Sequence, residues 1–128
     1  MSDATDPLAW VQRAEEDYTT ARYSLRHKTP PTYIICFHAQ QCAEKYIKAL
    51  LISRAAVFPK THDLQIRSDL CVHSGILVGT DPKLLHELSE YGVKVRYPGD
   101  DPILAEARQA FEIAKSIRLF ARKFLGIR

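Results

Sequence analysis

The 128-residue chain is poor in the residue types that interrupt helices or build special sites. It has five glycines, one tryptophan and one methionine, and its three cysteines are an odd number. Cys36 and Cys42 lie in an apolar stretch, which is typical of reduced core thiols and not of a disulfide scaffold. Neither these two nor Cys71 has a spacing that predicts metal binding. We therefore expect no disulfide framework, no metal site and no cofactor.

Long apolar runs are also missing. No segment approaches the roughly 20 consecutive apolar residues that a membrane-spanning helix needs. Residues 1–6 are polar and acidic, unlike a signal peptide, which has a basic start and an apolar middle. The length suits one domain with one core. We expect a single domain over residues 1–128, located in the cytoplasm and not in a membrane.

Positively charged residues only slightly outnumber negatively charged ones. Lys and Arg number 18 against 15 Asp and Glu, which gives a formal charge of +3. Dedicated nucleic-acid-binding modules usually concentrate more positive charge than this. The composition therefore permits contact with RNA without predicting it.

Helix starts are marked by a repeated pair of residues. Asp6-Pro7, Asp81-Pro82 and Asp101-Pro102 each place a capping carboxylate before a proline that suits the first helical position. Together with apolar positions at helical spacing, they predict helices over about residues 7–27, 82–91 and 102–125. The last of these should bury Ile103 and Phe124 on its inner side.

Two further helices complete the predicted fold. Pro30-Pro31 forces a turn before a helix over about residues 32–55, and Thr61 can cap a helix that carries Asp63 in its first turn. Gly92 should end the fourth helix. Because no second strand-like run can pair with residues 93–95, a sheet is not expected. We predict an all-α, up-and-down antiparallel bundle of about five helices.

The helix predicted over residues 32–55 is mostly apolar but carries one polar line. The members of this line, at steps of three, four and three, are His38, Gln41, Lys45 and Lys48. Polar groups on a buried helix need partners from another helix, a second subunit or a ligand. The alternative is that Glu44 forms an ion pair with Lys48 at an i to i+4 spacing. The polar line would then face solvent or a dimer partner.

The final predicted helix carries a basic strip in which Lys115, Arg118 and Arg122 follow each other at steps of three and four. Cations near the end of a helix also suit its negative pole, which is sufficient to explain them. Binding of RNA or of an acidic partner is the alternative that this pattern leaves open.

Three motifs follow one another along the chain. They are Phe-His-Ala-Gln-Gln at 37–41 followed by Glu-Lys at 44–45 and Lys-Ala-Leu at 48–50, Lys-Thr-His-Asp-Leu at 60–64, and Arg-Tyr-Pro-Gly at 96–99. In this order they resemble the HEPN family, the "higher eukaryotes and prokaryotes nucleotide-binding" domains. The resemblance implies a helical bundle that forms a homodimer. It also implies a small nucleotidyltransferase as partner, within a toxin–antitoxin or related two-component system.

The resemblance carries a further expectation about activity. Catalytic HEPN proteins are metal-independent RNases with an Arg-x4-6-His motif near the start of a late helix. Arg96 occupies the arginine position here, but no histidine follows it, and the last histidine of the chain is His86. Proton transfer near neutral pH then needs another group. The catalytic candidates are Arg96, His38 and His62.

Two functional hypotheses follow. The first is a homodimeric module that binds nucleotide or RNA. The residues expected to bind are Arg96, Tyr97, His38, Gln41, Lys45, Lys48 and His62. The second is a diverged RNase in which Arg96 stabilises the phosphate and His38 or His62 acts as the base. Structural roles remain open for each, because Arg96 can bridge nearby aspartates, His38 can satisfy a buried partner and His62 can complete a helix cap.

Overall fold

The computed structural model describes residues 3–55, 63–73, 75–76, 78–93 and 97–128, and within these ranges it contains helices and no strand. The helices are α1 (Pro7–Leu25), α2 (Thr32–Ser53), α3 (Leu64–His73), α4 (Pro82–Val93) and α5 (Leu104–Phe124), preceded by the short 3-10 helix η1 (Asp3–Thr5). The predicted all-α bundle of five helices is confirmed. No helix in the described ranges is both long and apolar enough to cross a bilayer.

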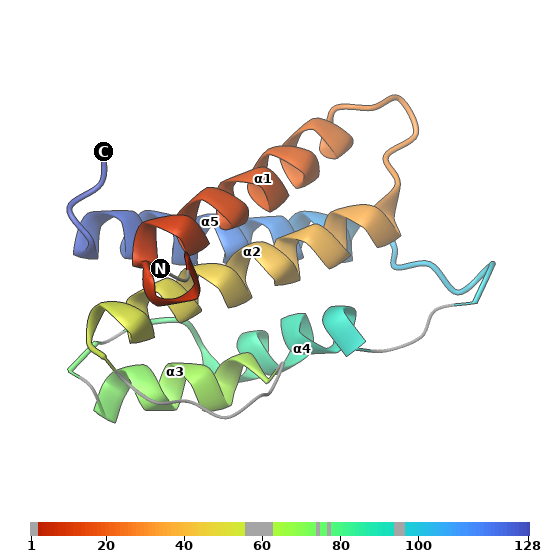
Figure 1. The fold of residues 1–128 in the computed structure, drawn as a ribbon. Helices are drawn as coiled ribbons and strands as arrows, with labels where there is room; N and C mark the ends of the chain where they lie inside the picture. Colours follow the sequence, from red (N-terminus) through yellow and green to blue (C-terminus); the bar gives the residue numbers. More distant parts are fainter. Residues whose placement is uncertain (1–2, 56–62, 74, 77, 94–96) are drawn as a thin grey trace.

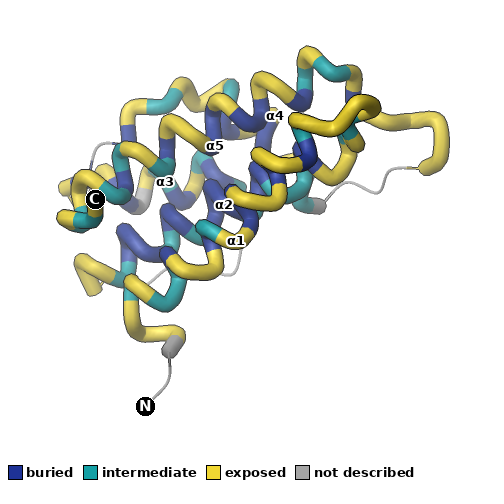
Figure 2. Tube along the Cα trace, turned by 90° about the horizontal axis from the view of Figure 1, so that it is seen from above, coloured by how far each residue is buried: buried dark blue, intermediate teal, exposed yellow. Residues whose placement is uncertain are grey.

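α2 is the central element of the bundle. It packs against each of the other four α-helices, most extensively against α1 and α5. α1 and α2 run side by side in opposite directions, with α5 behind them and α3 and α4 below (Figure 1). The buried turns face one another across these contacts (Figure 2). Because α2 is apolar on most sides, burial from several directions is the arrangement that its sequence favours.

Two of the three predicted aspartate caps are confirmed. Asp6 Oδ1 accepts a hydrogen bond from the backbone N–H of Leu8 at 3.0 Å, and Asp81 Oδ1 accepts one from Lys83 at 2.8 Å. Each bond satisfies an amide that the first turn of a helix leaves without an intrahelical partner.

The third cap, at Asp101, was predicted wrongly. α5 begins at Leu104, and Glu106 Oε1 accepts a hydrogen bond from the backbone N–H of Ile103 at 3.3 Å. The carboxylate of Glu106, in the first turn of α5, therefore caps this helix in place of Asp101. The predicted inner positions at the two ends of this helix are also wrong, since Ile103 is 65% exposed and Phe124 is 37% exposed.

α3 begins later than predicted. Asp63 Oδ1 accepts hydrogen bonds from the N–H groups of Gln65 and Ile66 at 2.9 and 3.4 Å, so Asp63 is itself the cap and does not lie in the first turn. The proposed cap Thr61 lies outside the described residues. These two bonds satisfy amides of the first turn, which is the role of a helix cap.

Gly92 does not end α4, as predicted, but lies within it. A Cβ at this position would approach Gln40 Oε1 of α2 to 2.4 Å. A side chain at this position would displace the buried amide of Gln40, so Gly92 is explained by this contact with α2 and not by a helix end.

Candidate functional site

The polar line of α2 meets a carboxylate on α1. Asp17 is only 8% exposed, and its Oδ1 lies 2.7 Å from Nδ1 of His38 while its Oδ2 lies 2.5 Å from Nζ of Lys45. We name these three residues the Asp17 cluster. One buried carboxylate thus holds two donors that are two turns apart on α2. The sequence analysis expected the polar line to need partners from another helix, a second subunit or a ligand. At these two positions the partner comes from another helix.

The Asp17 cluster leaves one ring nitrogen of His38 available. An ionised carboxylate only accepts hydrogen bonds, so we assign the proton to Nδ1, and Nε2 is then an acceptor. No residue in the described ranges hydrogen-bonds to Nε2, and the His38 side chain is 27% exposed. The edge-on contact between Phe37 and His38, with ring centroids 5.3 Å apart, further restrains the imidazole. The arrangement can accept a proton at Nε2 while Asp17 stabilises the resulting cation.

A second cluster lies further along α2, around the buried Glu44. Glu44 Oε2 accepts hydrogen bonds from Nε2 of Gln40 at 3.3 Å and of Gln41 at 3.5 Å. Its Oε1 lies 3.4 Å from Nη2 of Arg67, on α3, and 3.9 Å from Nζ of Lys48. We name these five residues the Glu44 cluster. The predicted Glu44–Lys48 pair is confirmed, although Arg67 is the nearer cation.

The Glu44 cluster is mainly structural. Gln40 is fully buried, and Glu44 and Arg67 are 3% and 2% exposed. Burial lowers the pKa of the Lys48 ammonium, and the positive charges of Arg67 and Lys45 add to this effect, whereas Glu44 opposes it. The side chains of Gln41 and Lys48, predicted to bind a ligand, are therefore engaged with Glu44 inside the protein.

A third carboxylate, Glu15 of α1, joins three helices. Arg118 of α5 donates to both of its oxygens, from Nε at 2.7 Å and from Nη2 at 2.8 Å. The hydroxyl of Tyr46 on α2 donates to Glu15 Oε2 at 2.5 Å, and Arg122 Nη1 lies 3.5 Å from Oε1. Two arginines of the predicted basic strip thus have an intramolecular partner, while Lys115 is exposed.

The Glu15 contacts predict a pH-dependent contribution to stability. Partial burial alone would raise the pKa of Glu15, but the hydrogen bonds from Arg118 and Tyr46 and the charge of Arg118 outweigh it, so this pKa lies below its ordinary value of 4.5. A lowered pKa in the folded state stabilises the protein above the unfolded pKa, and this stabilisation is lost as the pH falls through the folded value. In urea unfolding, Glu15→Gln should therefore be less stable than wild type at pH 7, and the difference should narrow below pH 4.5. A difference that is constant across this range would contradict the assignment.

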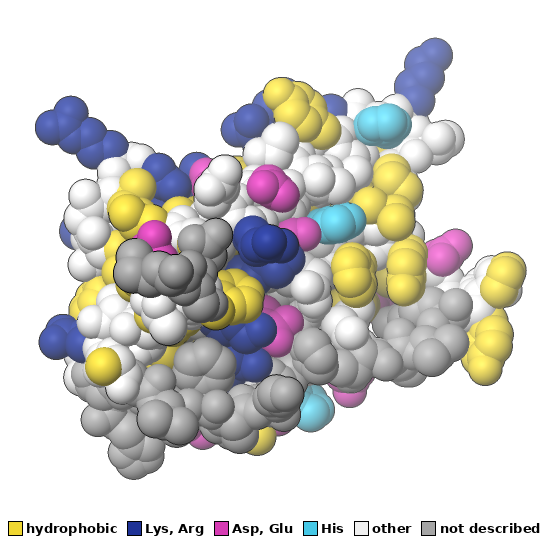
Figure 3. Space-filling model, viewed as in Figure 1, with side chains coloured by type: hydrophobic (Ala, Val, Ile, Leu, Met, Phe, Trp, Pro, Cys, Tyr) yellow, Lys and Arg dark blue, Asp and Glu magenta, His cyan; other side chains and the backbone are white. Residues whose placement is uncertain are grey.

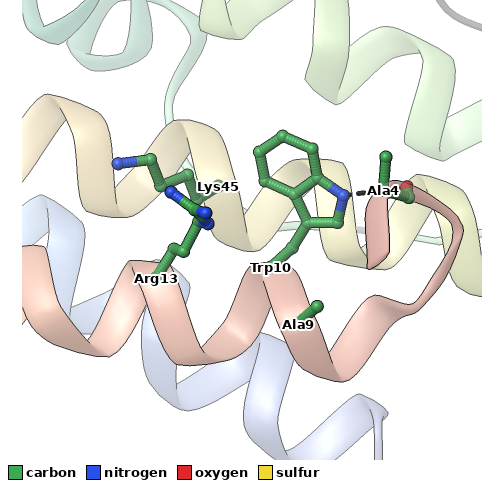
Figure 4. A pocket seen from close by; sticks show the side chains of 5 residues that line it. All are labelled: Ala4, Ala9, Trp10, Arg13 and Lys45. Atoms are coloured by element: carbon green, nitrogen blue, oxygen red, sulfur yellow. Dashed lines mark hydrogen bonds between the residues drawn. The ribbon is translucent and has the colours of Figure 1, made fainter. Parts of the chain in front are cut away.

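A small hollow lies beside the Asp17 cluster, between α1 and α2 (Figure 4). It has a volume of about 280 Å³ and is lined by Ala4, Ala9, Trp10, Arg13 and Lys45. The indole N–H of Trp10 donates to the backbone oxygen of Ala4 at 3.0 Å. Basic, acidic and histidine side chains gather across the middle of the same face of the molecule (Figure 3). Lys45 links the hollow to the Asp17 cluster.

Three of the other predicted site residues lie apart from this arrangement or are not described. Arg96 and His62 lie outside the described residues. Tyr97 is 71% exposed in a turn closed by the bond from Asp100 N–H to Tyr97 O at 2.9 Å, with Gly99 at φ +90°. This turn precedes α5 and projects beyond the end of the bundle (Figure 1). Of the predicted binding residues that the structure describes, Lys45 lines this hollow, and His38 shares the carboxylate of Asp17 with it.

Sequence reasoning missed Asp17, Arg67 and Arg13 as polar or binding partners, whereas Trp10, expected in the core, packs against it. Asp17 could have been found, because it lies three residues after Ala14 and four before Ala21, on the face of α1 that should be buried. Arg67 has no comparable signal. In the described ranges, no three His, Cys, Asp or Glu side chains gather in a way that could hold a metal ion.

Comparison with known proteins gives two matches. The sequence profile of the HEPN domain matches residues 8–124. A protein of Methanocaldococcus jannaschii named "Putative toxin MJ1304" is 30% identical over 95 residues, which covers 70% of this chain and 61% of that protein. The chain thus spans less than two thirds of the length of this curated relative. No solved structure shows a significant match.

Proposed function

The chain belongs to the HEPN domain family, and from this premise we propose that it is the HEPN component of a toxin–antitoxin-like two-component system and binds nucleotide or RNA. The toxin name of the archaeal relative supports the first part of this proposal. The family resemblance adds the finer parts, namely a homodimer in the cytoplasm with a small nucleotidyltransferase as its partner.

The observation that carries the binding proposal is the position of His38 and Lys45. Both side chains remain about a quarter exposed, at 27% and 23%, although a buried carboxylate fixes their orientation. Side chains that are already oriented by a fixed partner are positioned before a ligand arrives, which lowers the entropic cost of binding.

Calorimetry with ATP and with a generic single-stranded RNA tests this proposal. His38→Ala should weaken binding about tenfold, the value of one hydrogen bond to a charged group. The matched control is His86→Ala, because His86 is an exposed histidine on α4 whose side chain is 63% exposed and lies 3.7 Å from Glu90. Arg96→Ala extends the test to the family's arginine position. Absence of binding by wild type, or equal binding by both histidine variants, would contradict the proposal.

The assembly is tested separately. Light scattering should give twice the chain mass of 14.6 kDa at micromolar concentration, and the nucleotidyltransferase encoded nearby should copurify with the protein. The exposed apolar residues Tyr33 and Ile34, each 38% exposed at the start of α2, are available for such contacts. A monomer would contradict the dimer without affecting the ligand proposal.

One observation favours a second candidate function, a metal-independent RNase. The Asp17–His38 pair holds an imidazole with Nε2 open to solvent, and such a pair is suited to accept a proton. This supports His38 as the base that replaces the histidine missing after Arg96.

A further inference from the structure

We propose that the hollow between α1 and α2 is a subsite for a single nucleotide, in which the base packs on Trp10 and the phosphate contacts Arg13. This inference rests on the proposed nucleotide or RNA binding and adds where one nucleotide lies. The shared ligand chemistry is a flat ring joined to a phosphate. Its source is a free mononucleotide or one unit of a single-stranded RNA.

The aromatic surface is held in place before any ligand arrives. Trp10 is half-buried, and its N–H is fixed by the backbone oxygen of Ala4 at 3.0 Å. The ammonium of Lys48 lies 4.7 Å from the centre of the ring. The ring therefore has little rotational freedom to lose, and stacking of a base on an aromatic side chain contributes about 1–3 kcal/mol.

The positive charge beside this ring is supplied by Arg13. Arg13 follows Trp10 by three residues on α1, so the two side chains leave the same face of the helix. In Figure 4 the guanidinium of Arg13 lies beside the aliphatic part of Lys45, on the side nearer to Trp10, whereas the ammonium of Lys45 points away from Trp10. Arg13 is exposed and no carboxylate in the described ranges pairs with it, whereas the charge of Lys45 is compensated by Asp17 at 2.5 Å. Arg13 is thus the free cation of the hollow, and a guanidinium can hold two phosphate oxygens at once.

The size of the hollow limits the ligand. Its volume of about 280 Å³ lies close to the lower end of the range for small-molecule pockets, roughly 300–1,000 Å³. A hollow of this size can enclose no more than one nucleotide unit. Asp17 lies one turn beyond Arg13, but His38 and Lys45 share its negative charge, so it does not act as an unpaired anion against the phosphate.

The fluorescence of Trp10 reports directly on this subsite, because it is the chain's single tryptophan. We would titrate AMP, a short oligoadenylate and inorganic phosphate, and compare Arg13→Ala with Arg26→Ala. Arg26 is an exposed arginine at the far end of α1, over the ring of Tyr23, so its removal changes the net charge equally. We expect AMP or oligoadenylate to quench Trp10, with affinity about tenfold weaker in Arg13→Ala and unchanged in Arg26→Ala.

The outcomes separate the two sources and the two proposals. Quenching by AMP indicates a free mononucleotide, and quenching by oligoadenylate alone indicates RNA. Trp10 fluorescence that does not change while calorimetry still detects RNA binding would overturn the subsite and leave the proposed function standing. Equal affinity in wild type and Arg13→Ala, or inorganic phosphate that binds as tightly as AMP, would also overturn it. Absence of any binding in calorimetry would instead count against the proposed function.

Discussion

Arg67→Ala is expected to lower the free energy of unfolding by about 3–5 kcal/mol. Arg67 and Glu44 are 2% and 3% exposed, and their charged groups lie 3.4 Å apart across the α2–α3 contact. Removing the guanidinium leaves the Glu44 carboxylate buried next to a space that held the opposite charge. The amides of Gln40 and Gln41 carry no charge, and the ammonium of Lys48 lies farther from the carboxylate, at 3.9 Å, so Glu44 loses its nearer cation. Urea unfolding measures the effect as a lower midpoint.

A double variant distinguishes charge burial from loss of packing. Glu44→Gln combined with Arg67→Met removes both charges, keeps an acceptor for the neighbouring amides and fills most of the volume of the arginine. Replacing both members of a buried ion pair is often close to neutral, so the double variant should be markedly more stable than Arg67→Ala. A loss below about 1 kcal/mol in Arg67→Ala, the range of exposed ion pairs, would show that this pair is unimportant for stability.

If the chain cleaves RNA, His38→Ala is expected to slow cleavage by about 10²–10⁴-fold, the usual contribution of a positioned general base. In this reaction Nε2 of His38 takes the proton of a 2′-hydroxyl, whose oxygen attacks the adjacent phosphorus. The bond from phosphorus to the 5′-oxygen breaks, and that oxygen takes a proton from water. The products are a 2′,3′-cyclic phosphate and a 5′-hydroxyl end. Labelled RNA incubated with the protein in EDTA provides the measurement.

Asp17→Asn tests whether the carboxylate supports this role. The variant keeps the histidine but removes the charge that stabilises protonated His38, so cleavage should slow and the pH dependence of the rate should shift. His86→Ala serves as the control and should cleave like wild type. RNA that remains full-length with wild-type protein at high concentration would eliminate the RNase hypothesis and leave the binding hypothesis unaffected.

Local features of the sequence were sufficient for most of the fold. Asp6 and Asp81 cap their helices as predicted, because a capping carboxylate acts on amides two or three residues away. The prediction that Asp101 caps the last helix was wrong because the carboxylate of Glu106, in the first turn of α5, accepts the hydrogen bond there. The prediction that Gly92 ends α4 was wrong for a different reason. The side chain that it contacts in space, Gln40, is 52 positions away in the chain, so local sequence could not indicate this contact.

The candidate site was predicted only in part. The polar line of α2 was expected to need partners from another helix, a second subunit or a ligand, and for His38 and Lys45 the partner is Asp17 of another helix. The same line was expected to act as one binding surface, whereas Gln41 and Lys48 belong to the separate Glu44 cluster. The sequence does not show which polar groups of a helix are covered, because that depends on where its neighbours cross it.

The sequence by itself determined that this chain forms helices, where most of them begin, and that the apolar second helix lies at the centre with polar groups that need partners. Only the tertiary structure decided which partners these are, namely Asp17 for His38 and Lys45, and Arg67 for Glu44. It also placed Trp10 and Arg13 beside Lys45 around one hollow. Helix formation depends on residues a few positions apart, whereas charge pairing and cavity shape depend on side chains that only packing brings together.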